Sequence, residues 1–316
     1  MAANRKAEAS RSDLLDLEIE AQGLAARLPA LLIEAHRISQ ALAHGIHGRR
    51  RAGPGETFWQ FRQFQSNDTH IQIDWRRSAS SDRLYVRERE WEAAHTIWHW
   101  ADISPSMNFR SHLAKVTKRD RALVLMFALA ELLVDGGERI GLLGLMPPSA
   151  QRRITERMAE RLIEHEASDA AKDSLPPDVR LSRFSECILL SDFLEPIDVV
   201  MARIGALAAQ GLRGHLVQIL DPAEESLPYD GRVEFLNVES DDRWLASRVE
   251  GVREAYHQRL AAHRAAMDEL CRRHRWSFLV HHTDRPASEA LLTLHARISG
   301  EDRRFAGCGR DSEVRS

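Results

Sequence analysis

The sequence predicts an α/β protein built on a doubly wound, mainly parallel sheet, preceded by an N-terminal helical region and a small β extension. Two observations carry this prediction. From residue 93 onward, short apolar runs suited to strands alternate with longer amphipathic stretches suited to helices. Alternation of this kind is typical of a parallel sheet with helices on both faces. Hydrophobic residues make up 43% of the 316 residues and charged residues 29%, which is the balance of a globular chain and not of a disordered one.

The chain divides into four predicted regions. Residues 1–47 form a helical region, because apolar residues recur there at three- and four-residue steps, and Pro29 is expected to divide or kink the helix. Residues 48–92 begin as a Gly- and Arg-rich loop and continue as a small β element, because their aromatic runs alternate in polarity. Residues 93–300 form the α/β domain, and residues 301–316 form a flexible polar tail.

The α/β domain is expected to contain six strands separated by helices. The expected strands cover residues 96–103, 139–146, 185–191, 215–220, 232–238 and 276–281. The expected helices cover residues 116–135, 151–166, 196–210, 243–273 and 286–298. Each of these helices carries an apolar stripe for burial against the sheet.

Charge and cysteine usage exclude several classes of function. The chain has 44 Lys and Arg against 47 Asp and Glu, so no overall basic field exists to attract nucleic acid. Its three cysteines lie far apart without a CxxC spacing, which argues against a zinc site and favours a reducing cytoplasm. The most apolar stretch, residues 122–134, is shorter than the roughly 20 residues needed to span a bilayer. We therefore expect a cytoplasmic protein with no transmembrane segment.

The most informative string is DISPS, which follows the expected strand at 96–103 and supplies Asp102, Ser104 and Ser106. A second acid, Asp192, follows the strand at 185–191. Because the carboxyl ends of parallel strands meet at one edge of a sheet, these side chains are expected to converge. Their hard oxygen atoms suit Mg²⁺, with Mn²⁺ or Ca²⁺ as alternatives. The competing interpretation is that Asp102 and Ser104 only cap a turn or the next helix.

These residues resemble a known pattern. DISPS before a helix, with Asp192 after a later strand, is similar to the metal-ion-dependent adhesion site of a von Willebrand factor A-type domain. Together with the IDWR string at Ile73 and the later GGERIGLLGL, LDPAEESLPYDG and HHTDRP segments, it resembles the domain of unknown function 58 family. The resemblance implies a Rossmann-like domain whose metal site binds an acidic group of another protein without turnover. It also implies association with a MoxR-type AAA+ ATPase, in chaperone-like maturation or assembly of proteins.

The sequence departs from the adhesion-type pattern at one ligand. The resemblance implies a threonine on the loop at residues 166–176, and that loop contains none. Ser168 or Ser174 is the alternative hydroxyl ligand.

A second group of candidate residues lies in the small β element. It either forms a recognition surface for a partner or ties the β element to the α/β domain through ion pairs and a packed indole ring. Its members are Asp74, Trp75, Arg76 and Arg77.

Three functions remain open on the sequence. The first is a non-catalytic protein-interaction module that uses Mg²⁺ to bind a MoxR-type AAA+ ATPase or an acidic client. The second is a metal-dependent phosphohydrolase with Asp102 as nucleophile, although Ser104 stands where such chemistry needs a carboxylic acid. The third is a metal-free structural scaffold. We expect the first, and therefore no enzymatic activity.

Overall fold

The computed structural model describes residues 24–47, 58–64, 73–79, 83–89, 95–236 and 243–299. The beginning of the expected N-terminal helical region, the Gly- and Arg-rich loop and the expected tail lie outside the described residues.

A six-stranded sheet forms the centre of the molecule, with the strand order β10-β7-β6-β3-β4-β5. All neighbouring strands pair in parallel except β4 and β5, which form an antiparallel edge. The chain leaves β3 toward β4 and later returns to the other side of β3 as β6, so the winding reverses between β3 and β6. Ligands of open α/β sheets bind at such a switch point, beyond the carboxyl ends of the strands. The strands are β3 (Thr96–Ala101), β4 (Arg139–Leu142), β5 (Met146–Ser149), β6 (Glu186–Ser191), β7 (Arg213–Leu220) and β10 (Ser277–His282).

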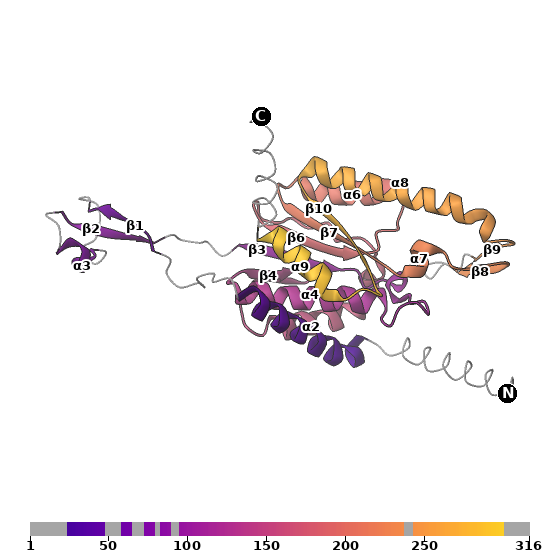
Figure 1. Cartoon of the computed structure of the whole chain (residues 1–316), viewed down its shortest axis with the longest axis horizontal. Helices are drawn as coiled ribbons and strands as arrows, with labels where there is room; N and C mark the ends of the chain where they lie inside the picture. The colour runs from indigo at the N-terminus through magenta and orange to yellow at the C-terminus, as the bar shows by residue number, and fades with distance from the viewer. Residues whose placement is uncertain are drawn as a thin grey trace, which may run out of the picture.

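Helices cover both faces of this sheet (Figure 1), which confirms the predicted doubly wound α/β fold. On one face lie α4 (Lys118–Asp135), α5 (Ile154–Glu166) and α9 (Ala287–Ile298), and α2 (Leu24–His47) packs against α4 from outside. On the other face lie α6 (Ile197–Ala208) and α8 (Glu250–His274). None of the described helices is long and apolar enough to cross a membrane.

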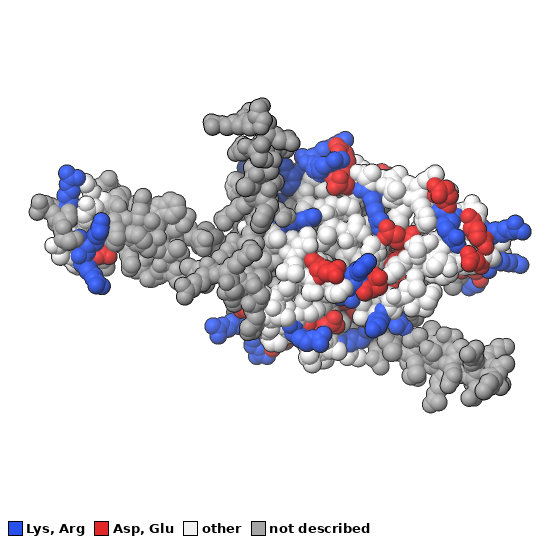
Figure 2. Space-filling model, in the orientation of Figure 1, with Lys and Arg blue, Asp and Glu red and all other residues white. Residues whose placement is uncertain are grey.

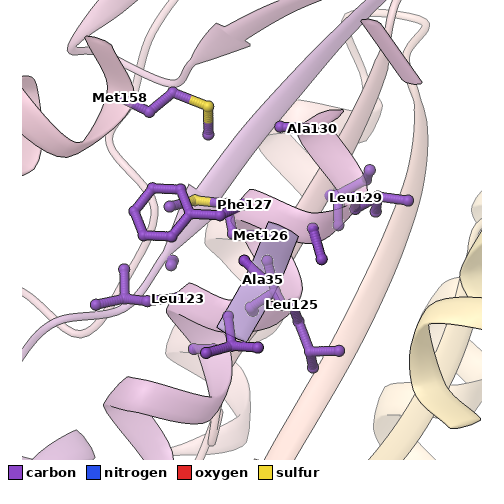
Figure 3. Close-up of a cluster of buried hydrophobic side chains, with 14 of the residues drawn as sticks. Ala35, Leu123, Leu125, Met126, Phe127, Leu129, Ala130 and Met158 are labelled. Carbon is purple, nitrogen blue, oxygen red and sulfur yellow. The ribbon is translucent and has the colours of Figure 1, made fainter. Parts of the chain in front are cut away.

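Helix α4 is the centre of the larger hydrophobic core (Figure 3). Leu123, Met126 and Phe127 are fully buried, because the sheet lies on one side of the helix and α2 on the other. A helix that is apolar on all sides is one that is surrounded by protein. Thr117 caps its first turn by accepting a hydrogen bond from the Asp120 amide over 3.1 Å. Helix α4 also contacts the 3-10 helix at Pro105–Asn108, so it helps to position the segment that contains DISPS.

Two predicted strands and one predicted helix are wrong in detail. The expected strand at 139–146 is a hairpin of β4 and β5, which turns at Gly144 with a φ of +74° that favours glycine. The expected strand at 232–238 stays outside the central sheet, because β8 (Val233–Leu236) pairs instead with β9 (Arg243–Ala246). The rings of Phe235 and Trp244 stack across this pair with centroids 5.5 Å apart. The expected helix at 243–273 consequently begins only at α8.

Pro29 does not divide the N-terminal helix. Helix α2 continues through it from Leu24 to His47. Leu28, Leu31 and Ala35 of this helix are buried against the core. Tertiary packing therefore outweighs the backbone hydrogen bond that proline removes.

The small β element contains β1 (Phe58–Gln63), a single helical turn α3 (Trp75–Ser78) and β2 (Tyr85–Arg89), with β1 and β2 antiparallel. Figure 1 shows it beyond the end of the sheet at which β3 begins, opposite the end that carries α7 (Pro222–Ser226). The α7 end is the one at which the parallel strands terminate.

Candidate metal centre

Two of the predicted ligands meet at the switch point. Asp102 directly follows β3 and Asp192 directly follows β6, and both side chains are buried. The hydroxyl of Ser191 donates a hydrogen bond to Oδ2 of Asp102 over 2.7 Å, and the Asp102 amide donates to the Leu190 carbonyl over 2.8 Å. The two strand ends are thus joined at the point where the sequence predicted that their carboxylates would converge.

The two serines of DISPS lie side by side. The Ser104 amide donates to Oδ1 of Asp102 over 2.8 Å, which turns the chain into the short 3-10 helix at Pro105–Asn108. The Oγ atoms of Ser104 and Ser106 are then 3.1 Å apart. Adjacent ligands of an octahedral Mg²⁺ at about 2.1 Å from the ion are roughly 3 Å apart. The spacing of the hydroxyls therefore fits two neighbouring ligands of one such ion.

Asp102 lies in an environment that favours a cation beside it. Its side chain is 0% exposed. Burial raises the pKa of Asp102 to about 7, the negative charge of Asp192 adds to this shift, and the hydrogen bonds from Ser104 and Ser191 oppose it. A divalent ion on the two serines would stabilise the negative charge of the buried Asp102. The residues present therefore fit a Mg²⁺ site.

Asp192 already has a cationic partner within the chain. The Nζ atom of Lys118 lies 2.7 Å from Oδ2 of Asp192 and 2.5 Å from Oε1 of Glu224, and this lysine side chain is only 1% exposed. Burial alone would lower the pKa of Lys118, but the charges of Asp192 and Glu224 outweigh it and raise the pKa above its usual range. The sequence does not reveal Lys118 as part of the site, because lysines are rarely buried and its spacing from DISPS carries no signal.

A third strand-end acid supports the loop that follows DISPS. Asp221, directly after β7, is fully buried and accepts hydrogen bonds from the amide and the hydroxyl of Ser111 at 2.9 and 2.5 Å. It also caps α7 in a capping box with Glu224. The sequence reasoning missed Asp221, although the Asp-Pro-x-Glu spacing after an apolar strand is a recognisable capping signal.

The structure separates the two candidates for the missing hydroxyl ligand. The hydroxyl of Ser168 donates to the His165 carbonyl over 2.7 Å and thereby stays at the end of α5. The hydroxyl of Ser174 donates to Oε1 of Glu195 over 2.8 Å, on the same loop as Asp192. Of the two candidates, Ser174 is therefore the one that contacts the loop carrying Asp192.

The residues of the IDWR string lie away from this centre. Asp74 caps α3 by accepting from the Arg77 amide over 2.9 Å, and the Arg77 guanidinium lies 5.9 Å from the centre of the Tyr85 ring. Trp75 is 62% exposed, so its ring is not packed as the anchoring interpretation required. These residues belong to the small β element before β3, at the end opposite DISPS (Figure 1).

The chemistry of the donors limits what the centre can hold. Among the described residues, no three His, Cys, Asp or Glu side chains gather as they do in a metal cage. The centre instead offers two hydroxyls backed by buried carboxylates. Such a set suits a hard ion that keeps several waters and takes a further ligand from another molecule.

A mainly parallel sheet with helices on both faces and a switch point between β3 and β6 places the molecule among Rossmann-like α/β proteins. Residues 60–266 match the family described as "Protein of unknown function DUF58", and the chain belongs to this family.

Related proteins and structures are remote. Uncharacterized protein Rv1480 of Mycobacterium tuberculosis and Uncharacterized protein Mb1516 of Mycobacterium bovis are each 27% identical over 263 residues, covering 78% of this chain and 81% of the relative. Two solved structures match with 14% identity, over 66% of this chain and 100% of the other. They are the conserved hypothetical protein BatB from Bacteroides thetaiotaomicron, with a TM-score of 0.35, and an aerotolerance-related membrane protein from Bacteroides fragilis, with a TM-score of 0.37.

Proposed function

We propose that this protein is a non-catalytic binding module in which Ser104 and Ser106 hold Mg²⁺ and the ion accepts a carboxylate of a partner protein. The observation that carries the proposal is the 3.1 Å spacing of the two serine hydroxyls beside the buried Asp102. With only these two serines as ligands from the described residues, coordination positions remain for a partner's Asp or Glu. In this reading the α/β domain is of the von Willebrand factor A type.

The surface beside the centre supports a protein partner. Leu113 and Leu194 are 42% and 40% exposed, and they lie on the loops that follow DISPS and Asp192. Exposed apolar side chains around a polar centre are typical of protein interfaces. On the face shown in Figure 2, basic and acidic side chains are interspersed, without a continuous basic patch of the kind that nucleic acid requires.

The partner we propose is a MoxR-type AAA+ ATPase or an acidic client, in the cytoplasm. This part of the proposal rests on the similarity of the chain to its family and on the carboxylate-seeking chemistry of the centre.

The buried state of Asp102 favours binding over phosphoryl transfer. Both of its carboxylate oxygens accept hydrogen bonds, one from the Ser104 amide and one from the Ser191 hydroxyl. A nucleophile needs an oxygen that faces the substrate.

The second candidate function is the metal-free scaffold. The pairing of Lys118 with Asp192 favours it, because the charge of that carboxylate is already balanced by the lysine.

The proposal is tested by capture of partners on the immobilised protein, in Mg²⁺ and in EDTA, with captured proteins identified by mass. Wild type is compared with Asp102→Ala and Ser106→Ala. Ser182→Ala is the matched control, because Ser182 is exposed and lies before β6, away from the carboxyl edge of the sheet. Capture of an AAA+ ATPase or acidic protein that needs Mg²⁺, Asp102 and Ser106 but not Ser182 supports the proposal. Capture that is indifferent to all of them favours the scaffold.

A further inference from the structure

A cavity of about 240 Å³ lies beside the metal centre, between the ends of β3 and β4 and the segment that follows α5. Its floor is buried and mainly apolar, and includes Leu142, Leu162 and Leu175. Its rim includes Gly144, Ala170 and Asp173, all of which are exposed. The cavity is therefore reached from solvent and ends in the hydrophobic core.

One polar side chain interrupts the apolar floor. His99 lines the cavity from β3 and is 0% exposed. Within the part of the chain that the structure describes, neither of its ring nitrogens has a hydrogen-bond partner of normal geometry. Burial lowers the pKa of His99 to about 3, and the backbone of Ile97 opposes this shift only in part. The ring is consequently neutral near pH 7 and offers one donor and one acceptor.

An unpartnered buried imidazole is costly to the folded protein unless something satisfies it. The binding function proposed for Ser104 and Ser106 makes no use of His99, which precedes DISPS within β3. A molecule bound in the cavity could supply the missing hydrogen-bond partner of the His99 ring. Small-molecule sites have this composition, with apolar walls and a single polar group that orients the ligand.

We propose that this cavity is a binding site for a small, uncharged, mainly apolar molecule that carries one hydroxyl or N–H group to pair with His99. The size argues for a ligand of about one aromatic ring, since a smaller apolar cavity of about 150 Å³ already accepts benzene. The ligand is uncharged because the buried floor is apolar and His99 is neutral, so nothing there would compensate a buried charge of either sign. Two residues of the lining, Ala101 and Ile103, flank Asp102, so the site is adjacent to the metal centre but separate from it.

The test is a calorimetric titration of the full chain in EDTA with 4-methylphenol and with p-xylene, which has nearly the same shape but no hydroxyl. We expect 4-methylphenol to bind about three- to tenfold more tightly than p-xylene, which corresponds to one hydrogen bond. His99→Leu should remove this preference and leave both probes equal. Because the titration contains no divalent ion, its outcome is independent of the function proposed for DISPS.

A second variant, at the exposed rim, keeps the proposal testable if His99→Leu does not fold. Ala170→Trp places a bulky ring on the exposed rim and should weaken both probes by at least tenfold. Ala167→Trp is its control, because Ala167 is exposed at the end of α5 and does not line the cavity. The proposal is overturned if wild type binds neither probe up to 1 mM. It is equally overturned if the two probes bind alike, or if Ala170→Trp and Ala167→Trp behave identically.

Discussion

The ammonium group of Lys118 lies 2.7 Å from the carboxylate of Asp192, so the carboxyl end of β6 carries a counter-ion that the chain itself supplies. The same ammonium also contacts Glu224, which reaches it from the first turn of α7. One buried cation thus connects the start of α4 with the ends of β6 and β7, around the edge of the sheet where DISPS lies.

Lys118→Met should increase the affinity of the centre for Mg²⁺ by about three- to tenfold, because Asp192 is then free to face the ion. The change should also destabilise the fold by about 3–5 kcal/mol, since it leaves two buried carboxylates without a partner. Lys118→Met combined with Glu224→Gln should recover part of this loss. Calorimetric Mg²⁺ titration and urea unfolding measure the two effects. An unchanged Mg²⁺ affinity in a folded variant would show that Lys118 and the ion do not compete.

Ser104→Ala and Ser106→Ala should each reduce Mg²⁺ affinity at least tenfold, because each removes one of the two neighbouring hydroxyls. Ser106→Ala should change the free energy of unfolding by less than about 1 kcal/mol, since its hydroxyl pairs only with that of Ser104 among the contacts of the centre. Ser174→Ala should reduce Mg²⁺ affinity less than either DISPS variant does, because the Ser174 hydroxyl donates to Glu195. Equal Mg²⁺ affinity in wild type and both DISPS variants would contradict the proposed ligand set.

His99 should make the stability of the protein depend on pH. Burial lowers its pKa to about 3 from the ordinary 6.5, so between these values the unfolded chain binds more protons than the folded one. The contribution of His99 is therefore complete above pH 6.5 and falls as the pH decreases toward 3, by about 5 kcal/mol in all and by about 3 kcal/mol down to pH 4.5. His281, whose pKa burial also lowers to about 3, acts in the same direction, whereas Asp102 acts in the opposite one. The measurement is the difference in unfolding free energy between wild type and His99→Leu from pH 7.5 to 4.5. A difference that does not change with pH would contradict it.

Leu28→Ala should destabilise the protein by about 2–5 kcal/mol, because Leu28 of α2 is buried in the core around α4. Ile33→Ala is the matched control on the same helix, since Ile33 is 72% exposed. It should change the unfolding free energy by less than about 0.5 kcal/mol. Similar losses from both substitutions, in urea unfolding, would show that burial against the core does not govern the contribution of α2, because alanine is the better helix former at both positions.

The parts of the fold that could be predicted are those encoded in local periodicity. Helix α4 follows from an apolar run longer than a strand allows, and DISPS and Asp192 follow from acids placed after apolar strands. The β4–β5 hairpin looks like one strand in the sequence, because its turn at Gly144 lies within a continuous apolar run and has no polar residue to mark it. The β8–β9 pair was missed because its cross-strand partners, Phe235 and Trp244, are not adjacent in the sequence.

The parts of the site that could not be predicted depend on contacts between distant segments. Lys118 and Asp192 are 74 residues apart in the chain. Ser111 and Asp221 are 110 residues apart. No spacing rule connects such residues, and the usual exposure of lysine points away from a buried role. His99 could be assigned to a strand from its neighbours, but its unpaired burial beside a cavity emerges only from the packing of the segment after α5.

The ion pair of Lys118 and Asp192 also makes folding independent of metal binding, whereas in many small metalloproteins the two occur together. Where a metal supplies the charge that holds a small fold together, the chain stays unfolded until the ion arrives. Here the lysine completes the charge balance at the end of β6 from within the same polypeptide. A newly synthesised chain can thus balance this charge and reach its native form without a divalent ion, so a metal bound later at the proposed centre would act on a molecule that is already folded.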